Sequence, residues 1–455
     1  MKKFSCFLFV FAAVFFAASA AVAAPKANGA EKLPKYIILF IGDGMSTPQR
    51  MLAEEFLRKS GKPGLAMNHM PYHCSTRSGS ANSIVTDSAA SGTAIACGTK
   101  TANGRIGVDA SGKVRLQSAA EVARDKKWKV GIISTMTINH ATPASFYGHR
   151  AKRQMYYELG IDLIESGFDF FAGGGIARGK NKEGADLYAL ARKKGYKTIV
   201  GDKKAFLALK PGCGKVIYSD MPGYMTLTID APQKAGTLAE MTAKGLELLK
   251  NPKGFFLMVE GGAIDTCGHA NDPAGNLQET LELDKAVKVA LNFAAKHPAE
   301  TLIVVTGDHE TGGMSLGCSS TGYALYPERL LAQKISAARF HALMKETRAK
   351  NKALTFADAQ KMLTANFGFK FSGDVKKDPM VVTTAQKQLL ADGFKAKRLA
   401  YAARTVMSQK AGVGWTTGSH TALPILTTAT GVQAHRFSGY IENTDISRII
   451  KSFIR

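Results

Sequence analysis

Apolar runs recur along the chain and are separated by stretches with helical spacing. The segments Lys35–Ile41, Lys129–Ser134, Phe255–Glu260 and Thr301–Gly307 are apolar at most positions, which is typical of strands buried on both faces of a sheet. Between them, apolar residues recur at the three-to-four-residue spacing of helices. This alternation predicts an α/β fold, with a large, mostly parallel central sheet and helices on both faces.

Shorter and more amphipathic stretches complete the predicted fold. We expect helices at Thr47–Lys59, Ser88–Cys97, Ala235–Lys250, Asn276–His297 and Asn443–Ile454, strands at Asp169–Ala172 and Leu423–Thr428, and a loop over 61–83. The last helix is predicted to begin near Asn443, Thr444 or Asp445, because Asn, Thr and Asp cap helix N-termini.

The pattern changes in the last third of the chain, where lysine becomes dense. Amphipathic helices are expected there at Ala337–Lys350, Phe356–Asn366 and Thr384–Leu390. We interpret residues of about 319–411 as a helical insertion that lies beside the core of one large domain, which spans 35–455.

The N-terminus has the pattern of a secretory signal peptide. Met1-Lys2-Lys3 is basic, an apolar run extends from Cys6 to Ala18, and Ala21-Val22-Ala23 is a typical cleavage sequence. We therefore predict a signal peptide over 1–23, a linker over 24–34, and a periplasmic or secreted protein that is not membrane-bound once the signal is removed.

Composition adds two observations. The 60 Lys and Arg against 36 Asp and Glu give a net charge of +24, which attracts anions, although solubility or adaptation to an acidic envelope explains it equally well. Outside the predicted signal the cysteines are odd in number and form no CxxC motif, so a cysteine metal cluster is not expected. Their pairing cannot be assigned from the sequence: they are Cys74, Cys97, Cys213, Cys267 and Cys318.

Carboxylates and imidazoles follow two of the apolar runs. Asp265 and His269 are four residues apart, so one helical turn would direct both toward the same ion. Asp308 and His309 directly follow another run, and His420 supplies a further imidazole. Mixed Asp and His ligands at strand ends are typical of zinc sites.

A second set of residues offers oxygen ligands and a nucleophile. Asp43, Thr142 and Glu260 form the kind of oxygen set that suits Mg²⁺ or Ca²⁺. Ser88 stands where a helix is expected to begin, and a helix N-terminus favours an incoming phosphate. Because no Gly-x-Ser-x-Gly motif surrounds Ser88, an acyl-transfer triad is not indicated. A metal-assisted transfer through this serine is the hypothesis that joins the two sets.

These motifs, in their order along the chain, resemble those of the alkaline phosphatase family. The matching segments are Ile41–Met45, Thr86–Ser91, Glu260–His269, Thr306–His309 and Ser419–Thr421. The resemblance extends from about Tyr36 to the C-terminal helix and is weakest in the insertion.

The resemblance implies a role for each site residue. It implies two zinc ions and one magnesium ion, with these ligands: Asp265, His269 and His420 for the first zinc, Asp43, Asp308 and His309 for the second, and Asp43, Thr142 and Glu260 for magnesium. Ser88 corresponds to the nucleophile that becomes phosphoserine. Arg153 corresponds to the arginine that grips two phosphate oxygens, with Arg150 as the competing candidate.

Two positions depart from the pattern of many bacterial members. His140 stands where they have Asp, and Thr266 stands where they have Lys. The first departure leaves the identity of the third metal open, and the second is expected to loosen phosphate binding.

The activity implied is hydrolysis of small phosphate monoesters by an exported, homodimeric enzyme with no specific nucleic-acid partner. The alternative within the same superfamily is a phosphodiesterase. A sulfatase is disfavoured because no Cys/Ser-x-Pro-x-Arg motif surrounds Ser88. The non-enzymatic alternative is a basic envelope protein that binds an anionic polymer and retains an inactive site.

Overall fold

The structure, a computed structural model, describes residues 32–230 and 237–455. The predicted signal peptide and all but the end of the predicted linker lie outside these residues. Within the described part, no helix is both long and apolar enough to cross a membrane. The five cysteines outside the predicted signal are all free thiols.

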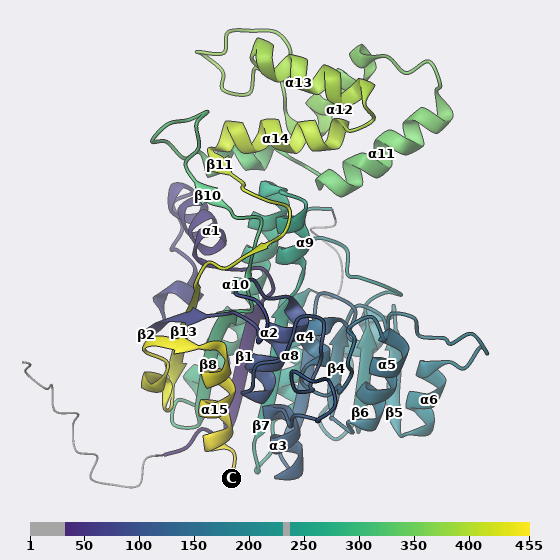
Figure 1. Cartoon of the computed structure of the whole chain (residues 1–455), viewed down its shortest axis with the longest axis vertical. Helices are drawn as coiled ribbons and strands as arrows, with labels where there is room; N and C mark the ends of the chain where they lie inside the picture. Colours follow the sequence, from purple (N-terminus) through teal and green to yellow (C-terminus); the bar gives the residue numbers. More distant parts are fainter. Residues whose placement is uncertain (1–31, 231–236) are drawn as a thin grey trace, which may run out of the picture. The chain divides into compact units, whose positions relative to one another are not determined.

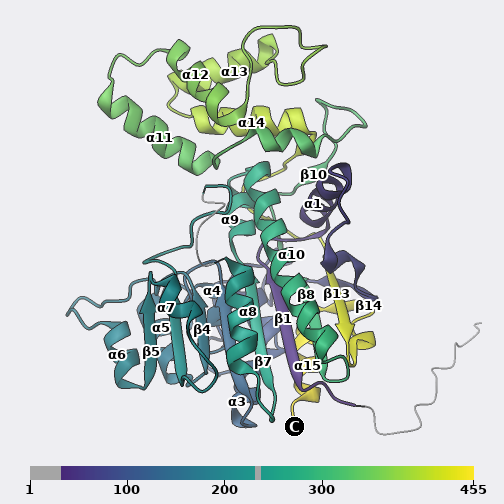
Figure 2. The ribbon, with the colours of Figure 1, turned by 180° about the vertical axis from the view of Figure 1, so that it is seen from behind.

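A ten-stranded sheet forms the centre of the described chain (Figures 1 and 2). Its strands are β1 (Tyr36–Gly42), β2 (Tyr72–Arg77), β3 (Lys129–Ser134), β4 (Phe170–Gly173), β5 (Tyr196–Val200), β6 (Lys215–Ser219), β7 (Phe255–Gly261), β8 (Thr301–Gly307), β13 (Ile425–Gly431) and β14 (Gly439–Glu442). The order across the sheet is β14-β2-β13-β8-β1-β7-β3-β4-β6-β5. Only β13 runs antiparallel to its neighbours among these strands, so the predicted, mostly parallel sheet is confirmed.

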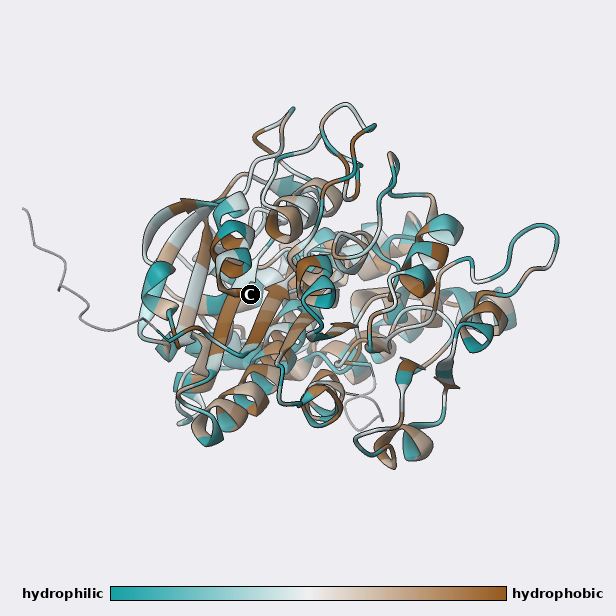
Figure 3. Cartoon of the chain, turned by 90° about the horizontal axis from the view of Figure 1, so that it is seen from below, coloured by the Kyte–Doolittle hydropathy of each residue, from teal (hydrophilic) through white to brown (hydrophobic). Residues whose placement is uncertain are grey.

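Both faces of the sheet are covered. Along β1, Ile38 and Phe40 pack into one hydrophobic cluster, whereas Ile37, Leu39 and Ile41 pack into a second cluster on the opposite face. This alternation follows from the two-residue period of a strand. Figure 3 shows central strands in the hydrophobic colour, with helices of mixed hydrophobic and hydrophilic residues around them.

Fifteen α-helices lie in the described residues. They are α1 (Thr47–Lys59), α2 (Ser88–Cys97), α3 (Ala119–Asp125), α4 (Ala141–Ala144), α5 (Tyr156–Glu165), α6 (Leu187–Lys193), α7 (Lys203–Leu207), α8 (Leu238–Leu249), α9 (Ala263–His269), α10 (Pro273–Lys296), α11 (Ala337–Lys350), α12 (Phe356–Phe367), α13 (Thr384–Lys395), α14 (Leu399–Ala411) and α15 (Asn443–Phe453).

Most predicted elements agree with these bounds, but the loop expected over 61–83 does not. That segment contains β2, which pairs antiparallel with β13 and parallel with β14. The sequence of β2, Tyr-His-Cys-Ser-Thr-Arg, has few apolar residues because only two of its six positions are buried. The last helix begins at Asn443 as predicted, but its N-cap is Glu442 rather than one of the three expected residues.

The segment predicted as an insertion is helical and closed at its base by a short ladder. β10 (Ser315–Leu316) pairs antiparallel with β11 (Val413–Gly414), so the chain leaves and returns at adjacent points. Between them, α11, α12, α13 and α14 form one group (Figure 1). The Asp272 carboxylate, the N-cap of α10, accepts hydrogen bonds from Gln333 Nε2 (2.9 Å) and Ala337 N (2.7 Å) and so ties the group to α10.

Candidate metal centre

Three parallel strands end side by side at the edge of the sheet that carries the candidate residues. Gly42 of β1 is in register with Gly261 of β7 and with Gly307 of β8. Asp43 and Asp308 each follow directly after these aligned glycines. The strand register thus places residues that are distant in sequence at one edge.

The turn after β1 brings the backbone unusually close to the site. Gly44 has a φ of +72°, and a Cβ added there would lie 2.8 Å from both Asp265 Cα and Thr311 Oγ1. A glycine is therefore required at this position. Its amide donates to Asp308 Oδ1 (3.0 Å), which orients that carboxylate and leaves Oδ2 directed into the site.

Ser88 is the first residue of α2 and is buried. The preceding residue, Asp87, caps the helix by accepting from Ala90 N (3.0 Å). The Ser88 hydroxyl lies 3.2 Å from His309 Nε2. The predicted serine at a helix N-terminus is thus beside the predicted imidazole, although the two are 221 residues apart.

The first candidate metal group consists of Asp43, Asp308 and His309, whose ligand atoms all lie within 4.8 Å of one another. His309 Nε2 is 3.1 Å from Asp308 Oδ2 and 3.5 Å from Asp43 Oδ1. Within the described residues, neither of these two buried oxygens has a hydrogen-bond partner. Buried acceptors facing one another are costly unless a cation lies between them, so this donor set fits a metal ion.

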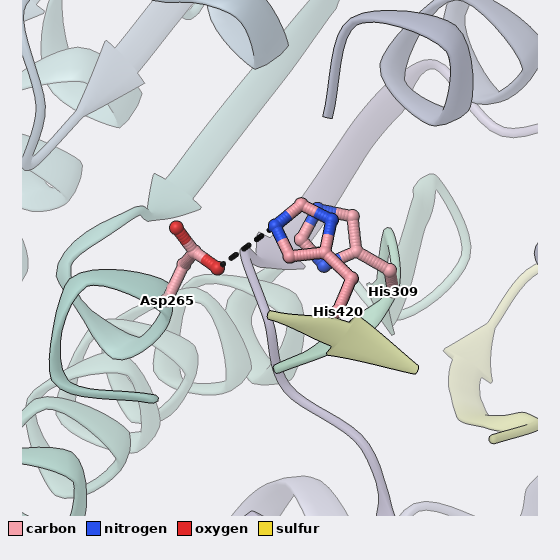
Figure 4. A group of neighbouring side chains, drawn as sticks. All are labelled: Asp265, His309 and His420. Carbon is pink, nitrogen blue, oxygen red and sulfur yellow. Dashed lines mark ion pairs between the residues drawn. The ribbon is translucent and has the colours of Figure 1, made fainter. Parts of the chain in front are cut away.

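A second group surrounds Asp265 (Figure 4). His420 Nε2 lies 3.6 Å from Asp265 Oδ1, and the His309 and His420 rings stack with centroids 3.6 Å apart. His269 is also close, with Nε2 3.1 Å from His420 Nε2 and 3.4 Å from Asp265 Oδ2. The expected trio of Asp265, His269 and His420 is therefore brought together, with the imidazole of His309 adjacent.

Two of these imidazoles are oriented by backbone carbonyls. His269 Nδ1 lies 2.7 Å from Gly418 O, and His420 Nδ1 lies 2.9 Å from Thr86 O. A carbonyl can only accept, so each Nδ1 carries the proton and each Nε2 keeps a lone pair for a metal.

A third group contains Asp43, Glu260 and His140. Thr142 Oγ1 donates to Asp43 Oδ2 (3.4 Å), and Ser134 Oγ donates to Glu260 Oε2. Glu260 Oε1 is buried and has no hydrogen-bond partner in the described chain. Asp43 belongs to both this group and the first, so one carboxylate joins two candidate sites.

The electrostatics of the edge reflect several like charges in a buried space. Burial, together with the neighbouring carboxylates, raises the pKa of Asp43 and of Asp308 well above their usual range. Burial raises the pKa of Glu260 to about 7. Burial and the nearby His420 hold the pKa of His309 well below its usual value. Cations at this edge would reverse the raised pKa values of the carboxylates by favouring their ionised forms, and would keep the His309 imidazole neutral.

The two arginine candidates have different ion-pair partners. Arg153 Nη1 donates to Asp87 Oδ2 (3.0 Å), next to Ser88, and Nη2 lies 3.4 Å from His140 Nε2. Arg150 instead forms an ion pair with Asp162. The geometry therefore places Arg153 beside the serine.

Two other predicted positions lie further from the centre of the site. Thr266 is exposed, and its hydroxyl lies 3.9 Å from Met136 Sδ. Cys267, between Asp265 and His269, is buried and is absent from the candidate metal groups of the described chain.

Two residues that sequence reasoning missed connect the metal groups. Thr311 Oγ1 donates to Asp265 Oδ1 (2.5 Å) and lies 3.3 Å from His309 Nδ1. The buried Glu310 carboxylate accepts from Gln49 Nε2 (2.8 Å) and from Thr421 Oγ1. These residues form β9 (Glu310–Thr311), which pairs with β12 (His420–Thr421) and holds His420 against the site. Their adjacency to Asp308-His309 was the only available signal.

Comparisons with known proteins identify the family of the chain. The alkaline phosphatase family model matches residues 34–455. The chain belongs to the alkaline phosphatase family. Alkaline phosphatase 3 of Bacillus subtilis (strain 168) is 31% identical over 471 residues, which cover 98% of this chain and 97% of that relative. Alkaline phosphatase of Escherichia coli (strain K12) is 33% identical over 344 residues, which cover 63% of this chain and 72% of that relative.

Solved alkaline phosphatases share the fold. The cold-active alkaline phosphatase of Shewanella sp. superposes with a TM-score of 0.80 at 28% identity and covers 92% of this chain and 100% of its own. The alkaline phosphatase of the Antarctic bacterium TAB5 gives 0.67 at 26% identity, with 93% and 99% coverage. Alkaline phosphatases are metal-dependent enzymes that act on small phosphate monoesters, and the candidate groups described above could hold metal ions.

Proposed function

We propose that this alkaline phosphatase hydrolyses phosphate monoesters through a phosphoserine at Ser88. The observation that carries the proposal is the 3.2 Å separation between Ser88 Oγ and His309 Nε2. His309 belongs to both the Asp43–Asp308–His309 group and the Asp265–His309–His420 group. A hydroxyl in this position is within reach of a cation held by either group.

We assign two zinc ions and one further divalent ion to these residues. Asp265, His269 and His420 would hold one zinc, and Asp43, Asp308 and His309 the other. When bound, such ions lower the pKa of a coordinated hydroxyl or water and neutralise charge on a leaving oxygen. The unpaired oxygens of Asp43 and Asp308 support this assignment.

The third site takes its ligands from Asp43, Glu260 and Thr142, with His140 at its edge. An all-oxygen set would suit magnesium, whereas an imidazole weakens that preference. Two variants of the TAB5 enzyme, in which a histidine is replaced by glutamate or aspartate, carry magnesium in a site called M3. We infer that His140 controls which ion this chain accepts.

The proposed reaction has two displacements at phosphorus. Ser88 Oγ loses its proton to solvent water and forms a bond to phosphorus while the ester P–O bond breaks, and the leaving oxygen takes up a proton from water to give the alcohol. Water then attacks the phosphoserine, which restores the Ser88 hydroxyl and releases phosphate. Arg153 grips two phosphoryl oxygens, and the N-terminal amides of α2 add positive potential as charge develops.

We also propose export and a homodimeric state. The basic, apolar and small-residue series over 1–23 supports a secretory signal and a periplasmic or secreted location. The dimer rests on family likeness, and sedimentation analysis of the purified enzyme would test it.

Ser88→Ala combined with metal removal tests the proposal. We expect hydrolysis of p-nitrophenyl phosphate to fall by roughly three orders of magnitude or more in the variant, because no other side chain replaces the nucleophile. Chelation should abolish the wild-type activity, and zinc with magnesium should restore it. Ser111→Ala, on an exposed loop, is the matched control.

Isotope labelling separates the nucleophile from a merely structural serine. Wild-type enzyme quenched in acid should retain labelled phosphate, and the Ser88→Ala enzyme should retain none. Full activity in the variant would refute the phosphoserine. Faster hydrolysis of bis-p-nitrophenyl phosphate than of the monoester would instead favour the phosphodiesterase reading.

A further inference from the structure

The helical insertion carries a large share of the positive charge. Residues 319–411 contain 17 Lys and Arg against six Asp and Glu, a net charge of +11 out of +24 for the whole chain. This segment is about a fifth of the chain. Charge concentrated in this way produces a local positive field that attracts anions to the insertion.

Part of this charge surrounds a cavity of about 330 Å³. Its apolar lining consists of Met344 on α11 and of Leu399 and Ala400 on α14, all of which are buried. Its remaining lining residues are His341, Lys345, Arg348 and Lys397. The cavity therefore joins an apolar floor to a basic rim, and among the described residues that line it none is Asp or Glu.

The arrangement of the rim follows from helix geometry. His341, Lys345 and Arg348 are spaced four and three residues apart on α11, so they share one face. Arg348 Nη2 donates to Phe394 O (2.6 Å), and its guanidinium lies 4.6 Å from the centre of the Phe394 ring. These contacts fix the plane of the guanidinium and leave its other N–H groups available.

The two lysines of the rim have no ion-pair partner within residues 32–230 and 237–455. Other basic residues of the insertion are paired, such as Arg339 with Glu346 (3.2 Å) and Lys361 with Asp358 (3.8 Å). Unpaired cations around one cavity are the charge complement of an acidic ligand.

Lys397 also has an unusual backbone. It lies in the turn between α13 and α14 with a φ of +57°, a conformation that glycine adopts far more readily. The chain therefore retains a long cationic side chain where glycine would be less strained. A residue held against its backbone preference is a candidate for a binding role.

We propose that this cavity binds an anionic amphiphile with a single alkyl chain. Its acidic head group contacts Lys345, Arg348 and Lys397, and its chain covers Met344, Leu399 and Ala400. A bare anion would satisfy the rim but leave the apolar floor in water, whereas a neutral alkyl compound would leave the cations unpaired. None of these residues belongs to the proposed catalytic site, so the proposal does not depend on the reaction.

Titration calorimetry with decanoate tests the proposal on the full-length, metal-loaded enzyme. Excess inorganic phosphate is present throughout, because it occupies the catalytic site and competes with purely electrostatic binding. We expect one decanoate per chain, and we expect acetate, which has the head group without the chain, to bind at least tenfold more weakly.

Four variants locate the site. Lys345→Glu and Lys397→Gly should each weaken decanoate binding about tenfold, and Lys397→Gly keeps the left-handed turn. Ala400→Leu should fill the floor and weaken binding while leaving the rim charge unchanged. Lys387→Glu, on the exposed surface of α13 and outside the cavity, makes the same charge change as Lys345→Glu and should leave binding unchanged. Activity toward p-nitrophenyl phosphate should be unchanged in all four.

Three results would overturn the proposal. An equal loss of decanoate affinity in Lys387→Glu and Lys345→Glu would mean that decanoate is attracted by the summed charge of the insertion and not by the cavity. Equal affinity for acetate and decanoate would mean that the floor takes no part. A change in sedimentation of the Ala400→Leu or Lys345→Glu enzyme, without saturable decanoate binding in the wild type, would assign this face to contact with a second copy of the chain.

Discussion

The sheet edge that carries the proposed catalytic residues and the helical insertion distribute their charged side chains in opposite ways. At the edge, Asp43, Glu260 and Asp308 are fully buried, and neighbouring carboxylates add to the effect of burial in raising the pKa of Asp43 and Asp308. In the insertion, most cations are exposed to solvent, on helices and in the loops between them. At the edge, three aligned strands fix the backbone so that the carboxylates lie close together. In the insertion, the cations are distributed over an exposed surface.

This difference separates two kinds of energetic cost. Buried like charges cost free energy unless they are neutralised by protons or by a ligand of opposite charge, so bound cations would stabilise the edge. Exposed lysines cost little in water, and they act mainly through their summed field. Substitutions at the edge should therefore change chemistry and metal content together, while substitutions in the insertion should leave both intact.

Asp43→Asn should cause the largest loss of activity and of bound metal. Asp43 belongs to two candidate metal groups, so loss of its charge weakens two sites at once. We expect activity to fall by about 10³-fold, or about 4 kcal/mol of transition-state stabilisation. Metal analysis should show less than the wild-type content at two sites. Asp308→Asn, which affects one group, is the comparison, and equal metal content in the two variants would contradict the shared role.

Lys410 provides an exception inside the insertion, because it is buried. Its ammonium donates to Pro379 O (2.7 Å) and Val381 O (2.9 Å), and burial lowers its pKa to about 8. Between pH 8 and about 10.5 the unfolded chain therefore holds more protons than the folded chain. Stability should rise across this range by up to about 3 kcal/mol, and Lys410→Met should remove that rise.

The two tryptophans allow this pH effect to be assigned to a region. Trp415 Nε1 donates to Ser408 Oγ (3.1 Å) on α14, whereas Trp128 is buried beside β3. Denaturant unfolding followed by Trp415 fluorescence in a Trp128→Phe background should report the pH slope. Lys387→Met, at an exposed lysine, should keep that slope. A slope unchanged by Lys410→Met would show that another group titrates.

Thr311→Val should produce a smaller loss at the edge. The hydroxyl connects Asp265 with His309, and so links the two proposed zinc sites. Removing it while keeping the shape should lower zinc affinity by about 10–100-fold, as for other partners of metal ligands. Competition with a chelator measures this directly. Thr311→Ser should restore most of the affinity, and an equal loss in both variants would point to packing rather than to the hydroxyl.

The fold was most predictable where burial was complete. β8 was predicted at its exact bounds, Thr301–Gly307, because all seven residues are buried and the run ends at a polar motif. β2 was missed because it has few apolar residues and is extended through its pairing with β13 and β14. Partners that are distant in sequence, rather than local pattern, create such a strand.

The site was predictable as a set of ligand types but not as a geometry. Asp308-His309 could be predicted as a ligand pair because an acid and an imidazole directly follow a buried strand. The choice between Arg150 and Arg153 could not be predicted from local sequence, since it depends on their ion pairs with Asp162 and Asp87 in the folded chain. The bridging hydroxyl of Thr311 has no signature of its own, because threonine is common in strands.

His140→Asp should have the smallest effect on rate but a specific effect on metal content. Burial, with Arg153 nearby, lowers the pKa of His140 to about 3, so the imidazole is neutral and adds no charge to the group of Asp43 and Glu260. An aspartate would add a negative oxygen ligand, which magnesium prefers. Magnesium content should rise, and an unchanged magnesium content would contradict the proposal that His140 controls which ion binds.

Because Arg153 Nη2 lies 3.4 Å from His140 Nε2, the new carboxylate should also draw Arg153 toward itself. We expect a change of about threefold in kcat, with a larger change in KM because the arginine would grip phosphate less well.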